Sequence, residues 1–159
     1  MNPHYFRIFL SSPGDVPEER AIVHEVADHI QKSAGLRGRV MLEVVAWDRR
    51  GAPPMEANLT PQEAIRRGLP RPAECDIVVV IFWSRLGTPL ELDGQPYHSG
   101  THYEYLDAFN AAQGEGSPRI LVYRRTQEPL ISLSDPERDE KIKQWDKVNT
   151  FFKSFEDEK

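Results

Sequence analysis

The sequence is poor in cysteine, because Cys75 is the only one among 159 residues. One thiol cannot close a disulfide within the chain, and it cannot supply a metal site built from several thiolates. Cys75 stands at the start of an apolar run, where we expect it to be a small core side chain. The composition therefore excludes a disulfide-stapled protein and indicates a reducing compartment.

Long apolar runs and a basic surface pattern are also missing. No stretch approaches the ~20 apolar residues that span a bilayer, and residues 1–5 lack the basic and apolar regions of a signal peptide. The net charge of -5, with no block of basic residues, disfavours binding that depends on nucleic-acid phosphates. Neither a Gly-x-Gly-x-x-Gly nor a P-loop pattern occurs. We therefore expect a cytoplasmic protein without nucleic-acid or membrane partners and without a conventional dinucleotide or nucleoside-triphosphate fold.

What the sequence does contain is an alternation of strand and helix patterns. The run 76–83 is rich in β-branched residues and does not alternate with polar ones, as is typical of a central strand buried on both faces. Further strands are expected at 6–10, 40–47 and 119–123. Helices are expected from Asp15, at 60–65, at 101–112 and from Ser134. This order predicts one α/β domain with a mostly parallel, doubly wound sheet.

Two helices have well-marked apolar faces. In the first helix, Asp15 and Glu18 are spaced as a capping box with Pro17 in the first turn. The side chains expected to face the sheet are those of Ile22, Val23, Val26 and Ile30. In the last helix, the apolar face is expected to hold Ile142, Trp145, Val148, Phe152 and Phe155. The chain ends in a charged run directly after this helix, where a doubly wound sheet would normally continue, so we expect a longer protein.

Polar side chains follow the first and third expected strands. Ser11, Ser12 and Asp15 follow the first strand, and Ser84 and Arg85 follow the third. In an open α/β sheet, ligands bind at the carboxyl ends of the strands. A single helix-borne carboxylate, Glu104, follows soon after in the sequence. These residues predict a binding crevice at that edge of the sheet.

Several separate blocks of the sequence form a recognisable pattern. They are Ile8-Phe9-Leu10-Ser11-Ser12-Pro13-Gly14-Asp15-Val16 with Glu19-Arg20, Ala46-Trp47-Asp48, 59–65, Cys75-Asp76-Ile77-Val78-Val79-Val80, and Ser99-Gly100-Thr101 with Tyr103-Glu104. In this order and spacing they resemble a bacterial domain family related to the TIR (Toll/interleukin-1 receptor) domains. The resemblance covers most of residues 6–125. It implies a flavodoxin-like (TIR-like), doubly wound sheet flanked by helices that lacks its last strand. It also implies that residues 1–159 form the N-terminal domain of a longer protein with nucleotide-binding oligomerisation (NACHT) or repeat modules.

The resemblance also implies an activity. Catalytic TIR domains cleave the nicotinamide-ribose bond of NAD+, by hydrolysis or cyclisation, with one glutamate on the helix after the third strand. The matching residue is Glu104. The aromatic-cysteine pair that usually precedes this glutamate is replaced by His102 and Tyr103. The resemblance thus implies that NAD+ is the substrate and that no separate cofactor is needed. It also implies that the active form is a homo-oligomer and that the protein takes part in bacterial defence signalling.

One carboxylate suffices for this chemistry. Glycoside hydrolysis needs a second carboxyl group to protonate a poor leaving group, whereas the pyridinium of NAD+ departs as neutral nicotinamide. An ionised glutamate could stabilise the ribosyl cation that develops. The turn from Ser11 through Ser12 to Asp15 could bind the pyrophosphate through backbone N–H groups. The remaining substrate-binding candidates are Trp47 and Trp83 for stacking, Arg49, Arg50 and Arg85 for phosphate charge, and Ser84 and Thr101.

Other interpretations compete with this one. Thr101 and Glu104 are spaced as a capping box, which would occupy the carboxylate without any substrate. The tryptophans could simply close the core, and the arginines could be solvated. The chain could also be a non-catalytic adaptor that associates through the loop 48–58, or an enzyme acting on another N-glycosidic bond. His98 and His102 lack a second ligand cluster, so we expect no metal site.

Overall fold

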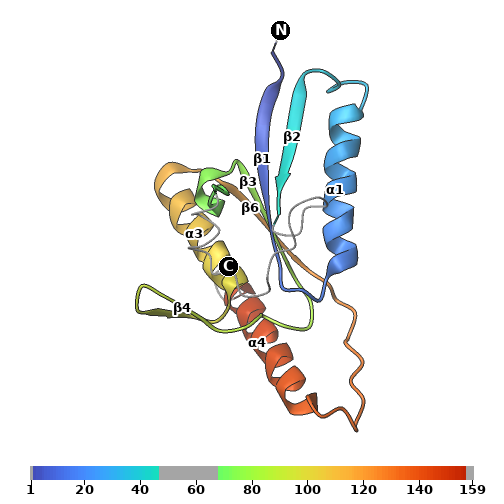
Figure 1. The fold of residues 1–159 in the computed structure, drawn as a ribbon, viewed down its shortest axis with the longest axis vertical. Coiled ribbons are helices and arrows are strands. Elements are labelled where there is room, and N and C mark those ends of the chain that lie inside the picture. Colours follow the sequence, from blue (N-terminus) through green and yellow to red (C-terminus); the bar gives the residue numbers. More distant parts are fainter. Residues whose placement is uncertain (1, 47–67, 157–159) are drawn as a thin grey trace.

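The computed structural model describes residues 2–46 and 68–156. Within these residues, a parallel sheet has the strand order β2-β1-β3-β6 (Figure 1). Its strands are β1 (His4–Ser11), β2 (Val40–Val45), β3 (Ile77–Phe82) and β6 (Arg119–Arg124). The α/β class and the parallel sheet expected from the sequence are confirmed.

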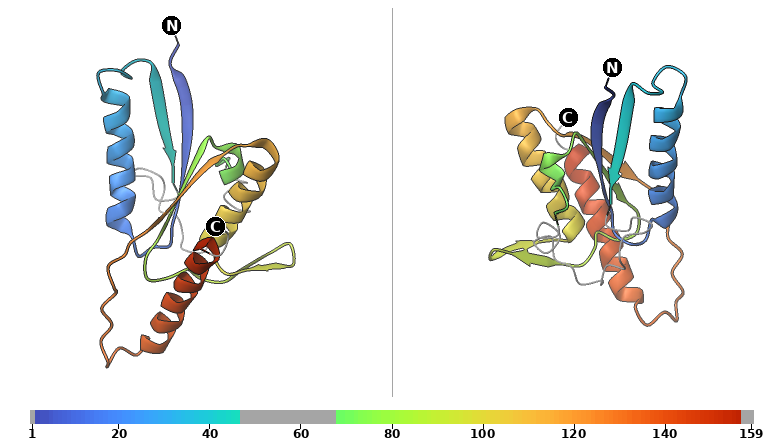
Figure 2. Two further views of the ribbon diagram at one scale, coloured as in Figure 1. Left: turned by 180° about the vertical axis from the view of Figure 1, so that it is seen from behind. Right: turned by 45° about the horizontal axis from the view of Figure 1, so that its top comes forward.

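Helices cover both faces of this sheet. Helix α1 (Pro17–Lys32) lies on one face, and α3 (Gly100–Glu115) and α4 (Arg138–Glu156) lie on the other (Figures 1 and 2). The sheet therefore separates two hydrophobic cores, and alternate residues of β3 serve each of them. Val78, Val80 and Phe82 pack towards α3 and α4, whereas Val79 and Ile81 pack on the α1 side. This double burial explains why β3 lacks polar alternation.

The start of α1 differs from the expected capping box. Val16 occupies the N-cap position and makes no side-chain capping bond, although Pro17 opens the helix as expected. Asp15 does not cap the helix, because its carboxylate accepts hydrogen bonds from Ser84 across the sheet edge. A tertiary contact has thus replaced the local capping contact that the spacing suggested.

The apolar face of α1 is only partly buried. Val23 packs on the sheet, but Ile22, Val26 and Ile30 keep 54%, 49% and 39% of their surface exposed, so the expectation that all four lie on the sheet is wrong. Helix α1 packs on β2 and leaves β6 less covered on this face, where Leu121 and Tyr123 keep 36% and 54% of their surface exposed. The result is a groove of about 760 Å³, which we call the α1–β6 groove. Its lining includes Ile22, Val26, Ile30, Val79, Leu121 and Tyr123.

The segment between β3 and α3, to which the sequence analysis assigned neither a strand nor a helix, holds a hairpin. Strands β4 (Leu90–Leu92) and β5 (Gln95–Tyr97) pair in antiparallel fashion. Asp93 and Gly94 connect them with φ angles of 50° and 74°. Positive φ at both central residues is the geometry of the tight hairpin turns that favour Asp-Gly. A short 3-10 helix, η1 (Pro72–Glu74), precedes β3.

Helix α4 follows its expected pattern except near its start. Val148 is fully buried, and Phe152 and Phe155 pack against the same core. Ile142 is 45% exposed, because the first turns of α4 extend beyond the sheet (Figure 1).

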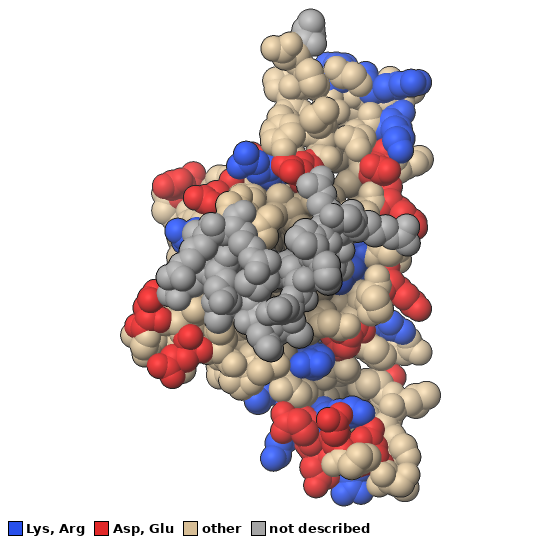
Figure 3. Space-filling model, viewed as in Figure 1, with Lys and Arg blue, Asp and Glu red and all other residues tan. Residues whose placement is uncertain are grey.

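Acidic side chains gather at the end of the molecule where α4 begins, and elsewhere on the same face acidic and basic side chains intermingle (Figure 3).

Part of the expected structure falls outside the described residues. This applies to the end of the second strand at Trp47, to the loop 48–58 and to the helix expected at 60–65. None of the helices in the described ranges is both long and apolar enough to cross a membrane.

Candidate functional site

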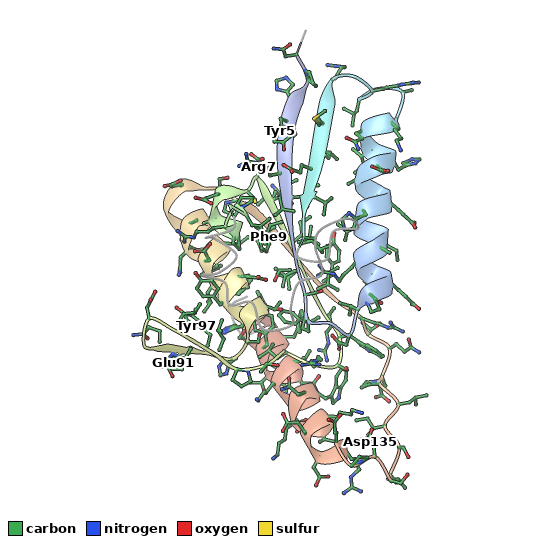
Figure 4. All side chains as sticks on the ribbon, viewed as in Figure 1. Tyr5, Arg7, Phe9, Glu91, Tyr97 and Asp135 are labelled. Atoms are coloured by element: carbon green, nitrogen blue, oxygen red, sulfur yellow. The ribbon has the colours of Figure 1, made fainter. Side chains whose placement is uncertain are left out.

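Ser11 marks the carboxyl end of β1, beside the central strand β3. It pairs in register with Val80, and its side chain is fully buried. Side chains alternate along a strand, so Ser11 lies on the same face of β1 as Phe9, which packs in the core under α3 and α4 (Figure 4). The hydroxyl of Ser11 is therefore directed to the α3 side of the sheet.

Helix α3 begins at a position fixed by two contacts. The hydroxyl of Ser99 accepts a hydrogen bond from the His102 N–H at 3.0 Å, which makes Ser99 the N-cap. Gly87 lies against Ser99 with a φ of 115°, and a side chain on Gly87 would come within 2.8 Å of the Ser99 Cβ. These contacts set which residues of α3 face the sheet. The buried ones are Thr101, Glu104, Tyr105 and Ala108.

Glu104 reaches from α3 to the end of β1. Its Oε2 accepts a hydrogen bond from the Ser11 hydroxyl, and the residue is only 7% exposed. The suggested capping box of Thr101 and Glu104 is wrong, because the cap is Ser99 and the third helical residue is His102. The carboxylate thus lies at the carboxyl end of β1, where the chain order reverses between β1 and β3.

A second pair of predicted residues joins the loops that follow β1 and β3. Asp15 Oδ2 accepts hydrogen bonds from the Ser84 N–H at 3.0 Å and from the Ser84 hydroxyl at 2.8 Å. Asp15 is four residues beyond Ser11 in the sequence, so the same loop carries both contacts. The sequence predicted that these residues would meet at one edge of the sheet, and the structure brings them together there.

The Asp15–Ser84 contact borders a cavity of about 520 Å³, which we call the edge cavity. This volume is in the range of small-molecule sites. Its walls come from the loop after β3, from residues 129–131 and from the first turns of α4. The lining residues are Asp15, Trp83, Ser84, Arg85, Thr88, Pro89, Pro129, Leu130, Ile131, Glu137, Glu140, Lys141 and Gln144.

The edge cavity thus includes four of the predicted site residues and several that sequence reasoning missed. Ser11 and Glu104 lie elsewhere, in a buried contact between β1 and α3, and Thr101 is buried in the first turn of α3. Glu140, Lys141 and Gln144 come from α4, more than fifty residues beyond Ser84. No local motif marks them, because only the packing of α4 beside the loop after β3 brings them to the site.

Trp83 is less available for stacking than its position suggested. Its Nε1–H donates to the Gln127 carbonyl oxygen at 2.6 Å, and the Arg125 guanidinium lies 4.1 Å from its ring centroid. Arg125 is itself held by Glu19 at 3.1 Å. A cation on one ring face leaves at most the other face for a ligand.

Ser12 is engaged with a residue that the sequence analysis did not single out. Arg20, which is 9% exposed, donates from Nη1 to the Ser12 hydroxyl at 2.7 Å. Pro17, at the start of α1, has no N–H group. The start of α1 therefore offers fewer backbone donors for a pyrophosphate than the sequence suggested.

The two histidines near the start of α3 lie with ring centroids 5.0 Å apart. Burial, with a contribution from His98, lowers the pKa of His102 below its ordinary value. Within residues 2–46 and 68–156, no group of three or more His, Cys, Asp or Glu side chains is placed to hold a metal ion.

Three of the predicted substrate-binding residues, Trp47, Arg49 and Arg50, lie outside the described residues.

No family model, curated protein or solved structure matches the chain. A buried carboxylate held by a serine lies at the carboxyl end of β1, and a cavity of ligand size opens further along the same edge. The carboxylate can supply a negative charge and the cavity has the volume of a small-molecule site, but neither Ser11 nor Glu104 lines that cavity.

Proposed function

We propose that the chain is a TIR-like domain that cleaves the nicotinamide-ribose bond of NAD+, with Glu104 as the catalytic residue. The observation that carries this proposal is the hydrogen bond between Ser11 and Glu104 at the carboxyl end of β1. A glutamate that only capped α3 would not be expected there. The order β2-β1-β3-β6 is also that of a flavodoxin-like sheet whose last strand would add beside β6.

In the proposed reaction, the bond between the ribose C1′ and the pyridinium nitrogen breaks, and the bonding electrons leave with nicotinamide. The positive charge moves from the pyridinium ring to the ribose, where the Glu104 carboxylate stabilises it. Water then adds to C1′ and releases a proton, giving ADP-ribose, or an internal nucleophile closes a cyclic product. No general acid is required, because nicotinamide departs as a neutral molecule.

The proposal extends to regulation and setting. The domain would act in the cytoplasm as a homo-oligomer in bacterial defence signalling. His102 and Tyr103, which replace the usual aromatic-cysteine pair, lie on the first turn of α3. Tyr103 packs edge-to-face on Tyr97 with centroids 5.0 Å apart. These side chains therefore have a structural role beside Glu104.

The experiment is to fuse the domain to an oligomerising partner, incubate it with NAD+ and measure nicotinamide by chromatography. We expect release by the wild type and at least a ~100-fold loss in Glu104→Gln, since the substitution removes the charge and keeps the shape. Glu115→Gln, on the exposed end of the same helix, is the matched control and should retain the wild-type rate. Absence of release by the wild type, or equal release by wild type and Glu104→Gln, would contradict the proposal.

The α1–β6 groove favours a second candidate, a non-catalytic adaptor that acts through homotypic association. Ile22 and Tyr123 are each 54% exposed in this groove, and exposed apolar patches of this kind commonly mark association surfaces. The adaptor predicts assembly without NAD+ turnover and no effect of Glu104→Gln. The nicotinamide assay therefore separates the two candidates.

A further inference from the structure

The ring of Phe151 connects α4 to the start of α3. It packs edge-to-face on His102 and Tyr105 of α3, with ring centroids 6.0 Å and 5.5 Å apart. It also packs on Phe82 of β3, with centroids 5.0 Å apart. Phe151 therefore joins the first turns of α3 to the central strand, and Tyr105 is the residue directly after Glu104.

His102 is the member of this aromatic cluster that can become charged near neutral pH. Its side chain is half-buried, and Nδ1 is buried without a hydrogen-bond partner among the described residues. A neutral imidazole leaves one nitrogen unprotonated, whereas an imidazolium carries a proton on both. In the charged ring Nδ1 must therefore be a buried N–H donor without an acceptor, which is unfavourable.

The charges around His102 also oppose a second proton. Its backbone N–H donates to the Ser99 cap, so the residue lies at the amino end of α3, which carries a partial positive charge. The first turn of α3 has no acidic residue to offset this charge. The ring of His98 lies 5.0 Å away between centroids. Burial, together with the charge of His98, lowers the pKa of His102.

We propose that the contact between His102 and Phe151 is pH-sensitive: the neutral imidazole holds the first turn of α3 against α4, and protonation expels the ring into water and loosens this turn. The exposed side chain of His98 shows that solvent borders this end of the helix. Glu104 lies at the start of the next turn, so acid would also loosen the helix segment that positions it. The inference goes beyond the proposed function and does not depend on it, because the contact involves no substrate.

The direction of the pH effect follows from the two states of the protein. In the unfolded chain His102 titrates near its ordinary pKa of 6.5, whereas burial lowers that pKa in the folded protein. As the pH falls below this value, the unfolded chain binds the proton more readily, and acid favours unfolding. The stabilisation that neutral His102 provides is therefore fully present above about pH 6.5 and is lost as the pH decreases.

The first test follows the His102 ring by NMR as the pH is lowered from about 7.5 to about 5. We expect a titration midpoint below 6.5, and NOEs between the His102 and Phe151 rings that disappear as the ring titrates. His98→Asn should raise the midpoint, because it removes a nearby positive charge. A midpoint at or above 6.5, as attraction of the imidazolium to the Phe151 ring would give, would overturn the inference. So would a ring that stays neutral at pH 5, or NOEs that persist after protonation.

The second test compares urea unfolding at about pH 7.5 and about pH 5, both above the range in which carboxyl groups ordinarily titrate. The urea midpoint of the wild type should be lower at pH 5. In His102→Phe, which keeps a ring against Phe151 but cannot be protonated, the decrease should be less than about half as large. His4→Gln, at the exposed start of β1, is the matched control and should show the wild-type decrease.

The pH dependence separates this inference from a purely structural role of His102. A structural role would shift the urea midpoint of His102→Phe by the same amount at both pH values, and the decrease would then equal that of the wild type. That result would contradict the inference. Neither test uses NAD+, so a failure here leaves the nicotinamide assay unaffected, and a failure of that assay leaves these tests unaffected.

Discussion

At the scale of single residues, Glu104 combines a buried position with a polar partner. A carboxylate that is 7% exposed is costly unless hydrogen bonds compensate for the water it has lost. Ser11 supplies one such bond from the end of β1, and it also fixes the direction of the carboxylate. In the proposed reaction, Ser11 is therefore a positioning residue and Glu104 the catalytic one.

Removing this hydroxyl should slow turnover more than it weakens binding. For Ser11→Ala in the oligomerised domain, we expect kcat to fall by about tenfold or more, because the carboxylate loses its orientation. KM should stay within about twofold. The measurement is steady-state nicotinamide release, with Ser33→Ala at the end of α1 as the matched control. A rise in KM at constant kcat would show instead that Ser11 binds substrate.

Cys75 allows a residue-scale test that is independent of function. It is 4% exposed, and burial raises the pKa of its thiol to about 12. The reactive thiolate is then scarce throughout the physiological range. We expect the native protein to react slowly with a thiol reagent at pH 8 and the urea-unfolded protein to react quickly. Equal rates in the two states would show that Cys75 is not in the core.

The residue types of the site could be predicted from the sequence, but their partners could not. Polar residues after β1 and β3 marked the correct edge of the sheet. The bond between Ser11 and Glu104 spans 93 residues of sequence, and the one between Asp15 and Ser84 spans 69. Such tertiary bonds prevailed over the local capping roles suggested for Asp15 and Glu104, because capping spacings are common and carry no information on long-range contacts.

At the scale of elements, the start of α3 depends on Gly87. This residue has a φ of 115° and leaves no space for a side chain beside Ser99, the N-cap of α3. A shift of Ser99 would move the helix that carries Glu104. The loop after β3 is thus coupled to the site through the position of the cap.

Gly87→Ala should destabilise the domain by about 3 kcal/mol, since unfavourable φ and steric overlap act together. Gly94→Ala is the matched control, because Gly94 also has a positive φ but would meet no atom within 4 Å. It should cost only about 1 kcal/mol. Urea unfolding followed by circular dichroism measures both. Equal losses would contradict a steric role for Gly87.

Elements with strong apolar patterns were predicted better than those defined by turns. The β-branched run of β3 identified the central strand because both of its faces are buried. The β4–β5 hairpin was missed although Asp93-Gly94 is a hairpin turn sequence, because its strands are only three residues long. The face of α1 was predicted only in part, because periodicity shows that a helix has an apolar side but not how much of that side the sheet covers.

At the scale of the whole molecule, the two faces of the sheet are covered unequally. Helices α3 and α4 pack over the face that includes Val78, Val80 and Phe82. On the opposite face, α1 leaves the α1–β6 groove open beside β6, the last strand in the order β2-β1-β3-β6. Apolar surface exposed in this way should be detectable in the native state.

We expect the native protein to enhance the fluorescence of an apolar dye at its groove. The double substitution of Ile22→Lys with Tyr123→Lys should remove most of this signal, because both side chains are 54% exposed and line the groove. Circular dichroism should show an unchanged fold. Leu133→Lys, on an 86% exposed residue outside the groove, is the control. A dye signal that the double substitution leaves intact would contradict this description of the surface.

The central claim is that Glu104 acts on the ribose of NAD+ and does not merely stabilise α3. The most direct measurement compares Glu104→Gln with the wild type for both NAD+ affinity and nicotinamide release. The account predicts a similar affinity, since shape and neighbouring contacts are kept, with release reduced at least ~100-fold. Unchanged release by a folded Glu104→Gln protein would contradict it.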